Sequence, residues 1–284
     1  MPFFLSTRTE ILDELSIRVR DTADSRYTEP EKVYAINGAI RKWANRVLVP
    51  FTTTLSTGFT SSSFTVQVPA YVNPRWMRPQ IETSALDYYD IPASVDTWVD
   101  LPSYTVEPDG SGGHLIRSEG YLYTSDVRII HWAAPGPVPI TTSASGPVVL
   151  VDSTTSMTVT TATNRLSECG FIKVNSEWIQ YSGIADAGST LTLSNLVRGV
   201  MGTTTATHDA DDVVDWGVPM DRIDLLEQLF SQAEATLHQM FITYASETES
   251  SKHQFAMRYA QQMADEYWKS YSSSYDPKLI LDFS

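Results

Sequence analysis

Carboxylate and imidazole side chains gather in one stretch of the sequence, His208-Asp-Ala-Asp-Asp212, which Asp215 follows. Three or four carboxylates that converge on one loop could bind a divalent cation, because hard cations prefer oxygen ligands. The spacing lacks the glycine and the terminal glutamate of a calcium-binding loop. A solvated acidic turn is the simpler interpretation, so we expect no metal site here.

The other reactive side chains do not form a catalytic set. Cys169 follows Glu168, whose negative charge is expected to raise the pKa of the thiol rather than activate it. The sequence contains no nucleophile elbow, no Gly-rich phosphate loop and no H-E-x-x-H motif. We therefore expect no enzyme activity, no catalytic residue and no cofactor. The histidines, which have no metal-ligand spacing on one predicted element, are His114, His131, His208, His238 and His253.

Tryptophans are scattered over the middle of the chain and have two interpretations. They could line a sugar- or protein-binding face, or they could fill the cores of small β-domains, which is more common. These residues are Trp76, Trp98, Trp132, Trp178 and Trp216.

Length and composition indicate a protein with a real core. The chain has 284 residues, of which 42% are hydrophobic, and this predicts one to three domains. No apolar run approaches the roughly 20 residues of a membrane span, and the first residues do not resemble a signal peptide. The single cysteine fits a reducing compartment, so we expect synthesis and assembly in a cytoplasm.

Negative charge is concentrated after the first 50 residues. Of the 20 Lys and Arg and the 34 Asp and Glu, residues 1–50 hold 8 and 7, which leaves 12 and 27 for residues 51–284. Binding to nucleic acid needs clustered Lys and Arg, so the balance argues against a surface that grips DNA. It is compatible with ordinary acidic solubility or with a surface that DNA slides past.

Apolar residues spaced by three and four predict helices at both ends of the chain. Capping boxes at Thr7–Glu10 and Thr28–Glu31 begin two helices, expected to end near Asp21 and near Val49, before Pro50. A third helix is predicted over 221–244. The fourth follows another capping-box spacing at 246–249, and its apolar stripe, with a strip of Ala256, Ala260 and Ala264 beside it, consists of Phe255, Tyr259, Met263 and Tyr267.

Alternating apolar residues and turn signals predict strands between these helices. In residues 51–138 the main strands are 64–68 and 127–132, with a hairpin over 115–123 that turns at 119–120. Prolines over 135–139 indicate a linker. In residues 139–218, a turn at Asn175-Ser176 joins two strands, Arg198-Gly199 and Gly202-Thr203 indicate further turns, and a last strand covers 213–216.

The predicted fold class is therefore α+β. About four helices from both chain ends form a bundle, with a β-rich middle and an additional small all-β module, a sandwich or barrel. The predicted divisions are 1–50 and 219–272 for the bundle, 51–138 for the β-rich segment, 139–218 for the inserted module and 273–284 for an extended tail.

This arrangement resembles the head–tail connector (adaptor) proteins of tailed bacteriophages. The resemblance lies in the stretch Glu31-Lys-Val-Tyr-Ala-Ile-Asn-Gly-Ala-Ile-Arg-Lys-Trp-Ala-Asn45, in the β-segment after it, and in the late helix pair 221–244 and 252–271. Residues 171–214 also resemble a β-module of phage structural proteins, through Glu177-Trp-Ile-Gln-Tyr181, Arg198-Gly199, Gly202-Thr203 and His208. Simpler members pass more directly from the β-segment to the closing helices, whereas here the 139–218 module intervenes.

The resemblance implies a structural virion protein of the tail vertex, assembled in the host bacterial cytoplasm. Such proteins form a homo-oligomeric ring, usually a dodecamer, under the portal protein. The ring extends the DNA channel, lets viral DNA pass without sequence-specific binding, and offers a platform to the next neck or tail-completion protein. No membrane is involved.

Closure of a ring needs a heterologous interface, and the helices are our candidates for it. An apolar segment at the end of the chain is a candidate for docking to the portal. The expected interface residues are Ile223, Leu226, Phe230, Leu237, Phe255, Tyr259 and Met263 for the neighbouring subunits, and Leu279, Ile280, Leu281 and Phe283 for the portal.

Two other classes of function remain open from the sequence. In one, the protein belongs to the tail or neck and its 139–218 module binds a receptor or glycan. In the other, a hydrolase would need His208 and the neighbouring aspartates to converge on a metal ion.

Overall fold

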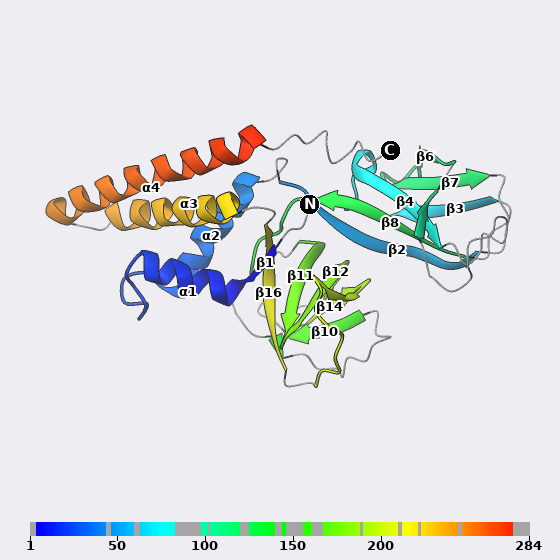
Figure 1. Ribbon diagram of the computed structural model, residues 1–284, viewed down its shortest axis with the longest axis horizontal. Coiled ribbons are helices and arrows are strands. Elements are labelled where there is room, and N and C mark those ends of the chain that lie inside the picture. The colour runs from blue at the N-terminus through cyan, green and yellow to red at the C-terminus, as the bar shows by residue number, and fades with distance from the viewer. Residues whose placement is uncertain are drawn as a thin grey trace. The chain divides into compact units, whose positions relative to one another are not determined.

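The computed structural model of the protein combines helices near both chain ends with several small β-sheets (Figure 1). Its described residues form four α-helices and four sheets, so the predicted α+β class and the helices at both ends are confirmed. The described residues are 4–43, 47–59, 63–82, 98–101, 103–119, 125–139, 144–145, 156–160, 167–187, 190–209, 212–220, 223–243 and 246–274.

The chain divides into two compact units. Unit 1 consists of Met1–Val47 and Ala134–Ser284, and unit 2 is Leu48–Ala133. The boundary at 133–134 immediately precedes the proline-rich segment that the sequence indicates as a linker. Residues 139–218, expected as a separate module, lie in the same compact unit as the helices.

The helices of unit 1 are α1 (Arg8–Arg18), α2 (Glu29–Trp43), α3 (Ile223–Ile242) and α4 (Glu247–Ser274). A complete capping box starts α1, since Thr7 and Glu10 exchange side-chain to backbone hydrogen bonds of 2.9 and 3.1 Å. The prediction that α2 continues to about Val49 is wrong, because Val49 and Pro50 already pair in a β-strand. Within the described helices, none is long and apolar enough to cross a membrane.

One hydrophobic cluster joins the helices from the two chain ends. The indole Nε1 of Trp43 in α2 donates a 2.7 Å hydrogen bond to Oε1 of Gln228 in α3. Arg18 of α1 binds both carboxylate oxygens of Glu227 in α3, at 2.7 and 2.8 Å. Buried members of the cluster include Ile11, Leu15, Val33, Ile36, Ile40, Leu225, Leu229, Ala233, Leu237 and Tyr271.

The described residues of unit 1 also form two sheets. One has the order β1-β16-β11-β12-β15, with β9 paired to β16, and the other has the order β10-β14-β13. Both contribute to a second buried cluster, which includes Val159, Ile172, Ile179, Leu193 and Trp216. The strands are β1 (Phe4–Thr7), β9 (Ala144–Ser145), β10 (Ser156–Thr160), β11 (Cys169–Val174), β12 (Glu177–Ser182), β13 (Ile184–Asp186), β14 (Thr190–Ser194), β15 (Val197–Val200) and β16 (Val213–Met220).

The predicted turn at Asn175-Ser176 is confirmed, since it joins β11 to β12 with Asn175 at a positive φ of 53°. Gly202 also lies in a turn, at φ 74°, as predicted. The turn predicted at Arg198-Gly199 is wrong, because both residues belong to β15, which pairs with β12. Here a glycine normally found in turns supplies a strand position that backbone and side-chain atoms of the following loop approach closely.

Unit 2 contains the sheets β2-β8-β4-β5 and β3-β7-β6. The first arm of the hairpin predicted over 115–123 is part of β7, which pairs with β3 and β6, and the predicted second arm lies outside the described residues. The predicted strands at 64–68 and 127–132 are confirmed. The elements are β2 (Val49–Phe59), β3 (Ser63–Val68), a short 3₁₀ helix (Pro74–Trp76), β4 (Met77–Glu82), β5 (Trp98–Asp100), β6 (Thr105–Pro108), β7 (His114–Glu119) and β8 (Ser125–Ala133).

Candidate functional site

The inner face of α4 is made of small side chains. Ala260 and Ala264 are buried, and they recur every four residues along the helix. Such a strip lets two helix backbones approach closely, so this face is committed to packing inside unit 1. Of the alanine strip expected from the sequence, Ala260 and Ala264 are therefore contacts within the subunit, whereas Ala256 is half-buried.

The outer face of α4 carries two large apolar side chains in solvent. Phe255 is 76% exposed and Tyr259 is 59% exposed, and their spacing of four residues places them one above the other on the helix. They are the two most favourable anchors for a partner on the described helices, because exposed aromatic pairs recover the most free energy when they are covered. We call Phe255 and Tyr259 the α4 outer pair.

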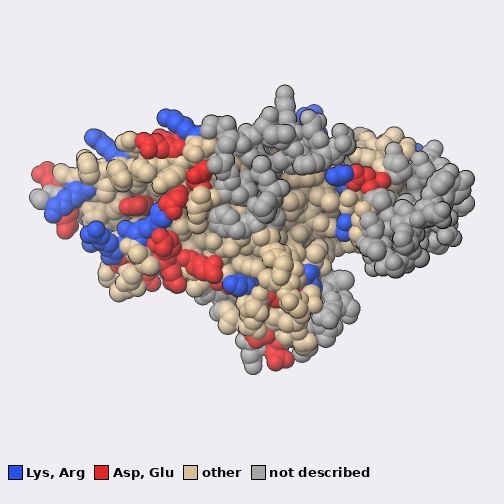
Figure 2. Space-filling model, in the orientation of Figure 1, with Lys and Arg blue, Asp and Glu red and all other residues tan. Residues whose placement is uncertain are grey.

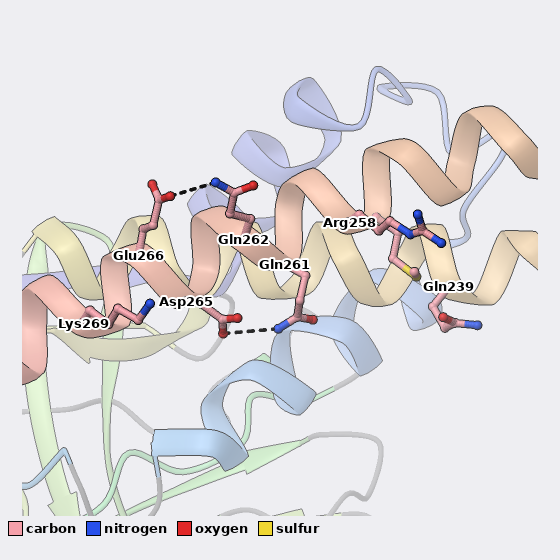
Figure 3. Close-up of a pocket in the computed structure, with 8 residues that line it drawn as sticks. Gln239, Arg258, Gln261, Gln262, Asp265, Glu266 and Lys269 are labelled. Carbon is pink, nitrogen blue, oxygen red and sulfur yellow. Dashed lines mark hydrogen bonds between the residues drawn. The ribbon is translucent and has the colours of Figure 1, made fainter.

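A shallow hollow of about 590 Å³ lies on the polar side of α4 (Figure 3). Hydrogen bonds one helical turn apart, from Gln262 to Glu266 at 2.9 Å and from Gln261 to Asp265 at 3.5 Å, run along its walls. These bonds direct one oxygen of each carboxylate toward an amide on the same helix. Its lining residues are Gln239, Met257, Arg258, Gln261, Gln262, Asp265, Glu266 and Lys269.

Charges of both signs mix over the helices on the face shown in Figure 2. The hollow on α4 repeats this mixture, with two basic and two acidic side chains among its lining residues. Alternating charge of this kind is typical of a surface that meets another protein or solvent, and it is unlike the clustered Lys and Arg of a nucleic-acid site.

The residues expected to form subunit contacts fall into three groups. Ile223, at the start of α3, is 62% exposed and joins the α4 outer pair as a surface residue. Phe230 and Leu237 are buried in the helical core, because α3 turns its apolar face toward α2 and α4. Leu226 and Met263 are half-buried. The portal-docking residues Leu279, Ile280, Leu281 and Phe283 lie outside the described part of the chain.

A second concentration of polar groups surrounds the buried carboxylate of Glu177, at the start of β12. Nε and Nη2 of Arg198 each donate a 2.6 Å hydrogen bond to this carboxylate, and His208 Nε2 lies 2.7 Å from it. The backbone N–H groups of Gly199 and Ala206 donate to the same oxygens at 3.0 and 3.1 Å. We call these five residues the Glu177 cluster.

The Glu177 cluster ties the loop between β15 and β16 to the start of β12. Burial alone would raise the pKa of Glu177, but hydrogen bonds from Arg198, His208 and the backbone of Ala206 outweigh it and lower the pKa to about 2. This carboxylate already accepts five hydrogen bonds from groups of the protein itself. Its effect is to fix the base of the loop at 201–207, which is largely exposed.

In the acidic stretch singled out in the sequence, Asp209 is exposed, as a solvated turn predicts, and residues 210–211 lie outside the described part of the chain. His208 is buried, and its Nδ1 lies 3.3 Å from Asp212 while its Nε2 contacts Glu177. The described residues contain no group of three or more His, Cys, Asp or Glu arranged to hold a metal ion. Sequence reasoning missed Glu177 as the centre, because its partners lie 21 and 31 residues away and only strand register brings them together.

Cys169 and the tryptophans belong to the interior. Burial, and then the negative charge of Glu168, raise the pKa of the Cys169 thiol to about 12, so the expected direction of the pKa shift is confirmed.

Trp178 and Trp216 are buried and Trp98 is half-buried, with the guanidinium of Arg128 4.1 Å from the centre of the Trp98 ring. Trp76 and Trp132 are also half-buried, so of the five only Trp178 and Trp216 fill a core.

Because the pKa of Glu177 is lowered by folding, part of the free energy of unfolding depends on pH. A carboxyl group whose folded pKa is depressed stabilises the fold above its unfolded pKa, about 4.5, and this contribution is lost as the pH falls toward about 2. We expect the urea midpoint of the wild-type protein to decrease over this range. The decrease should be smaller in Glu177→Gln, and equal slopes in the two proteins would contradict the assignment.

Comparison of the chain with protein-family models, with curated proteins and with solved structures found no match.

Proposed function

We propose that this protein is a structural subunit of a tailed-bacteriophage particle, a head–tail connector that forms a ring under the portal protein. In this role it extends the DNA channel, joins the capsid to the tail and presents a platform to the next neck protein. The helices from the two chain ends act as a bundle that supports the ring, and the β16-containing sheet with its neighbour acts as a small sandwich or barrel-like attachment. The ring is proposed to be a dodecamer, assembled in the cytoplasm of the bacterial host and retained in the virion.

The observation that carries the proposal is that α4 has one buried face and one exposed apolar face. Its alanine strip is used inside the subunit, while Phe255 and Tyr259 on the other side are left in solvent. A ring subunit needs one patch that contacts a different patch on its neighbour, and an exposed aromatic pair on a long, well-supported helix is suited to be one of them. The interface we propose therefore centres on Phe255, Tyr259 and Ile223, and it no longer includes Phe230 and Leu237.

The charge distribution supports a channel that DNA passes through. The formal net charge of the chain is −14, and the described helices mix basic and acidic side chains. Neither feature favours retention of phosphate, because tight DNA binding requires several uncompensated cations on one surface. In the proposed ring, DNA would move without sequence-specific contacts.

A second candidate function is recognition of a receptor or glycan by a tail or neck protein. It is favoured by the loop at 201–207, which lies on the surface with Thr204, Thr205 and Thr207 exposed and is fixed at its base by the Glu177 cluster. A rigid loop with hydroxyl groups loses little conformational entropy when it binds a polar ligand. Binding of the full-length protein to a glycan array, abolished by changes in this loop, would place this function first.

Imaging of complexes from infected cells tests the proposed function directly. A tagged copy of the protein is purified with its bound partners and examined by negative-stain electron microscopy. Rotationally symmetric rings attached to a portal or a capsid vertex are the expected result, and they would give the subunit number. Fibres or tail tips without a portal would reject the connector role and support the receptor-binding alternative.

Removal of the α4 outer pair is expected to disrupt ring formation without unfolding the subunit. Loss of two aromatic anchors at an interface costs at least about 2 kcal/mol, which weakens each subunit contact by about thirtyfold or more. The free energy of unfolding of the isolated subunit should change little, because both side chains are exposed. Phe255→Ala combined with Tyr259→Ala is compared with wild type by counting rings in the same purification.

Gln254→Ala is the matched control, since Gln254 is exposed on the same helix but on a different side from the outer pair. It should leave ring formation at the wild-type level. If the double variant incorporates into rings as well as wild type does, the interface is elsewhere, even if the rings themselves support the connector role.

A further inference from the structure

Two histidines and a tyrosine from three segments of unit 1 meet between α3 and α4. Nδ1 of His238 in α3 lies 2.9 Å from Nδ1 of His253 in α4. The hydroxyl of Tyr27, in the loop before α2, lies 3.3 Å from the same Nδ1 of His238. Tyr27 and His238 are buried and His253 is half-buried. The contact joins the first half of α4 to both α3 and the N-terminal part of the chain.

The distance between the two imidazoles limits how many protons they can hold. At 2.9 Å, one Nδ1 donates its proton and the other must accept it with a lone pair. If both rings are protonated, two N–H groups and two positive charges face each other, and the hydrogen bond cannot form. The hydrogen bond between the two rings therefore forms when one proton lies between the Nδ1 atoms. A second proton on these facing atoms breaks it.

The surroundings of His253 also oppose its protonation. The ring packs on Phe241, with 4.1 Å between the ring centres, and the guanidinium of Arg26 lies 5.8 Å from the centre of that phenyl ring. Burial, then His238, then Arg26 lower the pKa of His253, while Glu249 acts in the opposite direction. Neighbouring charged groups on each packed segment are Arg26 and Asp21 in the loop, Glu31 in α2, Glu234 in α3, 3.6 Å from His238 Nε2, and Glu249 in α4.

We propose that Tyr27, His238 and His253 form a proton-operated latch that holds the first half of α4 against α3. One proton between the facing Nδ1 atoms keeps the latch closed at neutral pH. Uptake of a second proton from solvent in mild acid breaks the contact and loosens the N-terminal half of α4. The α4 outer pair begins two residues after His253, so opening of the latch changes the position of that surface.

The sign of the pH dependence follows from linkage. In the unfolded chain His253 takes up a proton around its ordinary pKa of about 6.5. The closed latch takes it up at lower pH, so the unfolded or open state binds more protons below this value. Stability of the α3–α4 contact is therefore complete above about pH 6.5 and decreases as the pH falls below it.

Hydrogen exchange of the full-length protein tests the latch. The first three turns of α4 are expected to lose protection between pH 7.5 and pH 5.5, after correction for intrinsic exchange rates, in buffer that contains a chelator. His253→Gln keeps a side chain that can donate and accept hydrogen bonds but removes the second titrating ring. This variant should show at least threefold less change in protection over the same pH interval.

His114→Gln is the matched control, because His114 lies in β7 of unit 2. It should retain the wild-type pH response of α4. NMR of protein with labelled histidine gives an independent readout: in the wild-type protein the resonances of His253 should titrate at lower pH than those of an ordinary histidine, because burial and His238 lower its pKa. Unchanged pH dependence of α4 protection in His253→Gln, or titration of His253 at or above its ordinary pKa in the wild-type protein, would overturn the proposal.

Discussion

Replacement of Glu177 by alanine is expected to lower the free energy of unfolding by about 3–5 kcal/mol, because it leaves a buried guanidinium without its carboxylate. In the folded protein Arg198 is 4% exposed and Glu177 is fully buried, so water cannot take over the lost contacts. The backbone N–H groups of Gly199 and Ala206 lose their acceptor at the same time. Urea unfolding followed by far-UV circular dichroism measures the loss.

Glu107→Ala provides the comparison for this prediction. Glu107 pairs with Arg117 at 3.8 Å, but both side chains are more than 40% exposed, and surface pairs of this kind contribute between zero and about 1 kcal/mol. A cost for Glu177→Ala as small as that for Glu107→Ala would show that the Glu177 cluster does not hold the loop. Increased proteolysis within 201–207 in Glu177→Ala alone would support the assignment further.

Trp43→Ala is expected to cost about 3–5 kcal/mol in the stability of unit 1, through the cavity it creates and the hydrogen bond it removes. Trp43 is fully buried and is the largest side chain of the helical core. Its partner Gln228 lies 185 residues further along the chain, so the substitution weakens the contact between the two chain ends. Hydrogen exchange of α3 measures the effect in unit 1 without assuming that both units unfold together.

Two further substitutions separate the loss of volume from the loss of the hydrogen bond. One is at Trp43 itself and the other is at an exposed position of α2. Trp43→Phe retains most of the volume but leaves Oε1 of Gln228 without its donor, and a cost of about 1–3 kcal/mol is expected. Tyr34→Ala removes an aromatic side chain that is 57% exposed on α2, and it should change stability by less than about 1 kcal/mol. Equal costs for Tyr34→Ala and Trp43→Ala would contradict the shared helical core.

The helices could be predicted from the sequence because their information is local. A capping box and an apolar residue every three or four positions lie within one segment, and Thr7–Glu10 is an example of a signal that the structure confirms. Strand pairing depends on distant partners instead. Strand β1 has only four residues and is stabilised by β16, more than 200 residues later, so nothing near Phe4 identifies it.

The candidate sites also differ in whether their residues are close together in the sequence. The spacing of Phe255 and Tyr259 could be recognised in the sequence, but only the structure shows that Ala260 and Ala264 are buried while these two rings remain in solvent. The Glu177 cluster and the pair of histidines could not be predicted, since each joins residues from separate elements. His208 illustrates the difficulty: its sequence neighbours indicate an acidic turn, whereas its closest carboxylate is on another strand.

The order in which a ribosome delivers this chain has a consequence for how unit 1 completes its fold. Unit 2 is one continuous segment, but unit 1 is formed from residues on both sides of it. At about 5–20 residues per second, the 185 residues between Trp43 and Gln228 take roughly 10–40 s to synthesise. During that time α1 and α2 have emerged and α3 has not, so their apolar faces are uncovered. The nascent chain is then most prone to aggregation, and the N-terminal helices are the segment that a chaperone would have to protect.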